Sequence, residues 1–74
     1  MERIVADPKI LGGKPIIKGT RIAVSLILDL LASGMSPKEI VKEYCHLTEQ
    51  DIQAATRYAA SVLEGEHIVF KKAG

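Results

Sequence analysis

Residues 12–22, Gly-Gly-Lys-Pro-Ile-Ile-Lys-Gly-Thr-Arg-Ile, constrain the fold of this chain more than any other segment. A run of β-branched residues lies between two glycine-containing breaks, which is typical of a short strand bounded by tight turns. Pro15 lacks a backbone donor, so it indicates an edge strand or the first residues of a strand. With a second short run at Arg3-Ile4-Val5, the segment predicts a small β hairpin or arm. A hairpin alone is marginally stable, so it must pack on helices or on another chain.

The Gly19-Thr20-Arg21 turn at the end of this segment is expected to be structural. Gly19 is expected at a positive φ, and the Thr20 hydroxyl is expected to hydrogen bond the local backbone. We expect the Arg21 guanidinium to donate to carbonyl groups at a helix end.

Three helices are predicted after residue 22. The first, 23–33, is apolar on all but one thin stripe, so it must be buried from several sides. A chain of 74 residues offers too little cover, so we expect a homodimer or a hydrophobic partner. Gly34 is a natural residue for the end of this helix. The candidate dimer core comes from the arm and this helix: Ile16, Ile17, Ile22, Leu26 and Leu30.

The second helix has the clearest start signal, because Ser36-Pro37-Lys38-Glu39 combines an N-cap serine, proline at N1 and glutamate at N3. It is predicted to run to about Tyr44. After a three-residue turn, Thr48 is expected to cap a third helix that ends at Gly65. This arrangement is typical of a helix-turn-helix. The predicted fold is mainly α, a three-helix, homeodomain-like bundle in a single domain: a β arm (1–22), a helix-turn-helix unit (23–64) and a C-terminal tail (65–74).

The outward side of the third helix carries side chains suited to reading bases, since Gln pairs with adenine and Arg with guanine. Residues 1–22 carry five Lys or Arg against two Asp or Glu, in a chain of net charge +1, so the arm, Arg3 included, is a candidate for phosphate contacts. Ordinary solvated side chains remain the alternative, and Glu49 and Asp51 would repel phosphates. The candidate DNA-binding residues are Gln50, Gln53, Arg57, Lys14 and Lys18.

Catalysis finds little support. The one Cys and two His match no zinc pattern. Cys45 and His46 are adjacent, but nothing shows a base in reach of an activated nucleophile and oriented by a third group. The glycines around Lys14 do not form a phosphate-binding loop. We expect no enzyme, no catalytic residues, no metal and no cofactor. A lone Cys45 excludes an internal disulfide, and no apolar run reaches the ~18 residues that a membrane span needs. These features favour a soluble, cytoplasmic protein.

With these residues laid out, the chain resembles the domain-of-unknown-function family 433. The family's hallmark, Gly-Lys-Pro-x-Ile-x-Gly-Thr-Arg-Ile-x-Val, stands here at Gly13–Val24, and its Gly-x-Ser/Thr-Pro-x-Glu-Ile element at Gly34–Ile40. The resemblance extends from Ile4 to about Leu63. Ala23 and Cys45 depart from it, since many relatives have proline at both positions.

The resemblance implies a homeodomain-like, often dimeric helical fold with an N-terminal β arm. It also implies an antitoxin that binds and silences a PIN-like ribonuclease, and antitoxins of this kind commonly bind their own operator. No catalytic residues are established for the family. We therefore predict a dimeric helix-turn-helix antitoxin; the alternative is a protein-protein interaction module with a vestigial helix-turn-helix and no nucleic-acid contact. The candidate toxin-binding residues lie in the tail: Ile68, Phe70, Lys71 and Lys72.

Overall fold

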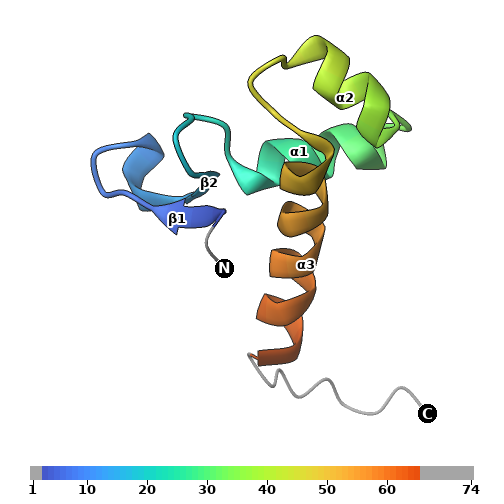
Figure 1. Cartoon of the computed structure of the whole chain (residues 1–74). Helices are drawn as coiled ribbons and strands as arrows, with labels where there is room; N and C mark the ends of the chain where they lie inside the picture. Colours follow the sequence, from blue (N-terminus) through green and yellow to red (C-terminus); the bar gives the residue numbers. More distant parts are fainter. Residues whose placement is uncertain (1–2, 66–74) are drawn as a thin grey trace, which may run out of the picture.

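The computed structural model of the chain describes residues 3–65, which form a mainly helical fold with a small sheet at its N-terminal side (Figure 1). This is the fold class that the sequence predicts. The elements follow in the order β1 (Ile4–Ala6), the short 3-10 turn η1 (Leu11–Gly13), β2 (Pro15–Ile17), α1 (Val24–Ala32), α2 (Pro37–Glu43) and α3 (Glu49–Gly65).

The predicted hairpin forms, with β1 and β2 paired antiparallel. Its register aligns Ile4 with Ile17 and Ala6 with Pro15. Pro15 is the first residue of β2, as its missing N–H predicts. On the other side of β2, Ile16 makes an isolated bridge to Ala23. The hairpin is thereby joined to the start of α1.

The turn between β2 and α1 confirms two of its three predicted roles. Gly19 has a φ of 82°, a conformation that glycine adopts without steric cost. The Thr20 hydroxyl donates to the carbonyl of Ile17 at 2.8 Å and accepts from the N–H of Ile22 at 2.9 Å. The prediction for Arg21 is wrong, because its guanidinium donates no hydrogen bond to any residue between 3 and 65.

The ends of α1 and α2 follow the predicted capping residues. Gly34, at a φ of 103°, donates its N–H to Leu31 at 3.0 Å, while Met35 donates to Leu30 at 3.1 Å; this pair of bonds is a Schellman motif. At the start of α2, the Ser36 hydroxyl accepts from the Glu39 N–H and the Glu39 carboxylate accepts from the Ser36 N–H. Both predicted signals are confirmed.

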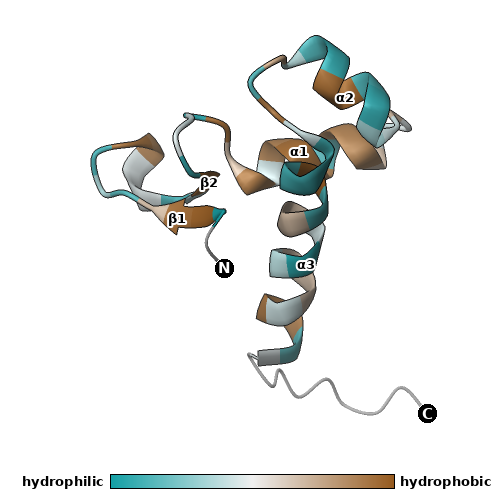
Figure 2. Cartoon of the chain, viewed as in Figure 1, coloured by the Kyte–Doolittle hydropathy of each residue, from teal (hydrophilic) through white to brown (hydrophobic). Residues whose placement is uncertain are grey.

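One core joins the hairpin to all three helices. Figure 2 shows that β1 and α1 consist largely of apolar residues. The buried cluster consists of Ile4, Ile17, Val24, Ile27, Ile40, Leu47, Ile52 and Ala55.

Burial within a single chain corrects part of the predicted dimer core. Ile16 and Ile17 are only 1% and 2% exposed within the single chain. Ile17 belongs to the core that the hairpin shares with the helices, whereas Ile16, on the opposite face of β2, lies beside Val5, Ile10 and Ile22. Ile16 and Ile17 have no surface left for a second copy, so their assignment to a dimer core is wrong. Ile22 and Leu30 are half-buried and Leu26 is exposed, and their place in a dimer stays a prediction.

Candidate functional site

The helix-turn-helix is built from α2, the connection at residues 44–48 and α3. The Leu47 N–H donates to the Tyr44 carbonyl at 2.8 Å, which tightens the connection. The Leu47 side chain is buried in the core and holds the start of α3 against the body. A short helix, a tight turn and a 17-residue helix therefore sit in the arrangement of a helix-turn-helix.

One face of α3 is polar and exposed. The buried residues of α3 lie on the opposite side of the helix: Asp51, Ile52 and Ala55. Three of the predicted DNA-binding residues are exposed on the outward side: Gln50, Gln53 and Arg57. Their side chains make no hydrogen bond within the described part of the chain. Their donors and acceptors are thus free to meet a ligand.

The first turn of α3 is closed by a buried carboxylate. The N–H of Asp51 donates to the Thr48 hydroxyl at 3.2 Å, and the Asp51 carboxylate accepts from the Thr48 N–H at 2.9 Å. The second oxygen of the carboxylate accepts from the Arg3 guanidinium, also at 2.9 Å. Asp51 is 6% exposed.

This pair changes the sequence interpretation of both residues. Arg3 was a candidate phosphate contact and Asp51 a residue that repels phosphates, but the two form an ion pair with each other, in which only Asp51 is buried. Only Glu49 remains as an exposed carboxylate in the first turn of α3. An aspartate three residues after a capping threonine was the available signal for the two capping bonds. The sequence had no signal for the burial of Asp51 or for its partner, 48 residues away.

The two arm lysines do not join the α3 residues in one surface. Gln50 and Gln53 line a depression of about 350 Å³ between α3 and the start of α2. Lys18 lies with Arg21 and His46 at a separate depression of about 790 Å³. Lys14 lies at a third, against the far half of α3. The five predicted DNA-binding residues therefore form one helix face and two separate cationic positions.

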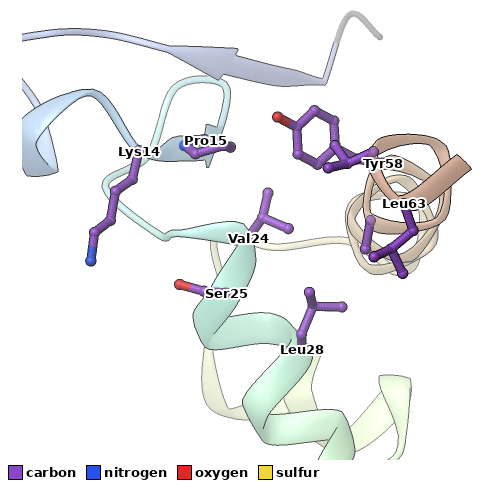
Figure 3. A pocket seen from close by; sticks show the side chains of 9 residues that line it. Lys14, Pro15, Val24, Ser25, Leu28, Tyr58 and Leu63 are labelled. Atoms are coloured by element: carbon purple, nitrogen blue, oxygen red, sulfur yellow. The ribbon is translucent and has the colours of Figure 1, made fainter. Parts of the chain in front are cut away.

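The depression beside Lys14 is the most apolar of the three, and we call it the α1–α3 groove. Its volume is about 540 Å³. Figure 3 shows Tyr58 extending from α3 toward Pro15, with Val24 and Leu28 of α1 directed into the same space. The residues that define the groove are Lys14, Pro15, Val24, Ser25, Leu28, Tyr58, Ala59, Val62 and Leu63.

Other classes of site are not seen between residues 3 and 65. No group of three or more His, Cys, Asp or Glu side chains in this range is placed to hold a metal ion. None of the helices described is both long enough and apolar enough to cross a membrane. The predicted toxin-binding residues Ile68, Phe70, Lys71 and Lys72 lie outside the described residues.

Comparison with known proteins identifies the family. The family model described as "Protein of unknown function (DUF433)" matches residues 4–59. The chain belongs to the DUF433 family. The match confirms the resemblance found in the sequence, and it ends within α3, six residues before the helix does.

Two DUF433 relatives cover most of this chain. A crystal structure of a family member from Anabaena variabilis has a TM-score of 0.78 and 32% sequence identity, over 85% of this chain and 62% of the other. An uncharacterized protein of Sinorhizobium fredii, y4eO, is 34% identical over 70 residues, which are 93% of this chain and 32% of the relative. This chain therefore spans less than two thirds of either protein.

A short match is closer in sequence. An uncharacterized protein of Archaeoglobus fulgidus is 67% identical over 24 residues, which are 32% of this chain and 67% of that protein.

Proposed function

We propose that this DUF433 protein is an antitoxin-type regulator that binds operator DNA through the outward face of α3 and silences a PIN-like ribonuclease. The observation that carries the DNA-binding part is the polar face of the second helix of a helix-turn-helix. Gln50, Gln53 and Arg57 are exposed there, and their side chains have no hydrogen-bond partner among residues 3–65.

The spacing of these side chains suits the major groove. Positions 50, 53 and 57 differ by three and four residues, so they share one side of the helix. Gln offers a bidentate pair to adenine, and Arg offers one to guanine. A second helix of a helix-turn-helix reads base edges with such residues, and a dimer reads two half-sites about 34 Å apart.

The ion pair between Arg3 and the buried Asp51 supports this function, because it neutralises a carboxylate at the start of α3. An exposed carboxylate at the start of α3 would face the phosphates that flank the groove. Because Asp51 is buried and paired, one of the two carboxylates of the first turn is already neutralised.

DNA binding is tested by fluorescence anisotropy with a labelled duplex from upstream of the protein's own gene. We expect saturable binding that weakens as salt rises. Arg57→Ala is expected to reduce affinity about 10- to 100-fold, the usual contribution of a bidentate Arg–guanine pair. Lys42→Ala is the matched control, since it removes one exposed cation from α2. No binding at low salt, or equal losses in the two variants, would contradict the proposal.

The antitoxin part of the proposal rests on the family resemblance, and a cytoplasmic location is proposed with it. The tail residues Ile68, Phe70, Lys71 and Lys72 are its proposed contacts, because apolar groups and cations suit a nuclease cleft that holds acidic metal ligands. Co-expression with the product of the adjacent gene tests it. We expect the full chain, but not a Phe70→Asp variant, to restore growth that this product inhibits.

A second candidate function is a protein-interaction module without DNA binding. The α1–α3 groove favours it, because an apolar depression at the surface is typical of protein contacts. The exposed Glu49 at the start of α3 favours it as well. The anisotropy experiment separates the two functions, since the module would show no DNA binding at any salt concentration.

A further inference from the structure

The apolar side of α3 is longer than the body that covers it. Every buried residue of this helix lies between Asp51 and Ala55. On the following turns Tyr58 and Val62 are only half-buried, and Leu63 is 67% exposed. Figure 1 shows this half of α3 extending beyond α1 and α2. An amphipathic helix that keeps its apolar side past the edge of its own fold offers that side to another surface.

We propose that a second copy of this chain covers the α1–α3 groove, with Leu63 of each copy inserted into the groove of the other. Leu63 is one of the residues that line the groove (Figure 3), and most of its side chain is exposed. An apolar side chain beside an apolar depression is self-complementary across a two-fold axis, because each copy then supplies one side chain and one groove. Both contacts form in the same closed dimer.

The charges around the groove favour a second copy over another partner. Lys14 lies at the groove, and Glu64 is exposed next to Leu63. Neither has an ion-pair partner within the described part of the chain. Insertion of Leu63 carries Glu64 of the same copy to the mouth of the other copy's groove, where Lys14 lies. The dimer therefore contains two ion pairs, each between Lys14 of one copy and Glu64 of the other.

This dimer deepens the proposed function, on which it rests for its biological role, since two copies present two α3 helices to DNA. It also goes beyond the family match, because Leu63 and Glu64 follow residue 59, where the match ends. It differs from the dimer predicted from sequence, which used Leu26 on another side of α1. Leu26 does not line the groove.

Analytical ultracentrifugation of the full chain, without DNA, tests the proposal. We expect a concentration-dependent dimer. Leu63→Lys should raise its dissociation constant about 100-fold or more, since two leucine contacts are lost per dimer. Leu26→Lys is the matched control, because Leu26 is also an exposed leucine, at 37%, and this variant should leave the constant unchanged. Circular dichroism checks that both variants are folded.

Charge reversal provides an independent arm. Glu64→Lys should weaken the dimer, and the double variant Lys14→Glu/Glu64→Lys should restore it. A monomeric wild type, an unchanged constant in Leu63→Lys, dissociation by Leu26→Lys alone, or no recovery in the double variant would each overturn the proposal. After any of these results, the occupant of the groove would have to be residues 66–74 of the same chain or another protein. The ultracentrifugation is done without DNA, so its result does not depend on DNA binding. A chain that dimerises there but binds no duplex in the anisotropy experiment would contradict only the DNA-binding proposal.

Discussion

Replacing Asp51 with alanine is expected to destabilise the fold more than the loss of a helix cap alone. The substitution removes the acceptor for the Thr48 N–H and the partner of the Arg3 guanidinium, both at 2.9 Å. Loss of a cap costs about 1 kcal/mol. The ion pair adds about 1 kcal/mol, near the upper end for a surface pair, because Asp51 is buried but the Arg3 side chain is 51% exposed.

The expected total is about 2 kcal/mol of unfolding free energy. A domain of this size has a stability of roughly 4–11 kcal/mol, so the loss is a substantial part of the whole. It corresponds to a fall in Tm of about 10 °C. Urea unfolding followed by circular dichroism gives the free energy directly, with the m-value showing whether the transition stays two-state. All variants are compared at one protein concentration, because dimerisation couples stability to concentration.

Three further variants divide the effect into its parts. Asp51→Asn keeps an acceptor for Thr48 but loses the charge, so it should cost less than Asp51→Ala. Arg3→Met tests the ion pair from the other side, and a double-mutant cycle with Asp51→Ala should show a coupling of about 1 kcal/mol. Asp29→Ala, which removes an exposed carboxylate from α1, should change stability by less than about 0.5 kcal/mol. An Asp51→Ala loss no larger than that of Asp29→Ala, or a coupling of zero, would refute the reasoning.

Other predictions concern the core and the Ser36–Glu39 capping box at the start of α2. Ile27→Ala should cost about 3–4 kcal/mol, because Ile27 is fully buried at the centre of the core and the deletion leaves a cavity; a loss under 1 kcal/mol in urea unfolding would argue against the packing described. Ser36→Ala should cost about 1 kcal/mol through loss of the bond to the Glu39 N–H, whereas Ser61→Ala, at an exposed position of α3, should be nearly neutral; equal effects would count against the cap.

Local signals in the sequence were sufficient for the helices and the hairpin. The Ser36 capping box and Gly34 fixed where α2 begins and α1 ends, because such motifs depend only on neighbouring residues. The first strand, predicted at residues 3–5, lies at Ile4–Ala6. Pro15 is the first residue of β2, a position that its missing N–H indicated.

Contacts between residues far apart in the chain could not be predicted from the sequence. A β-branched pair such as Ile16-Ile17 must be buried, but periodicity does not tell whether its own helices or a second copy buries it. In the structure its own chain buries both residues, with Ile17 in the core shared with the helices and Ile16 on the opposite face of β2. The partner of Asp51 is likewise set by the tertiary fold, which brings Arg3 across 48 residues. For the candidate site, the exposed face of α3 followed from helical spacing, while the separate positions of Lys14 and Lys18 depended on how the hairpin docks.

The proposal that the outward face of α3 binds DNA has a direct spectroscopic test. The chain contains two glutamines, Gln50 and Gln53, and no asparagine, so every side-chain amide pair in its ¹⁵N–¹H correlation spectrum comes from this face. In a titration of the labelled full chain with the upstream duplex, we predict that both pairs shift and that Arg57 shifts with them. Both pairs staying in place at saturating DNA, or shifts confined to the α1–α3 groove, would contradict the proposal.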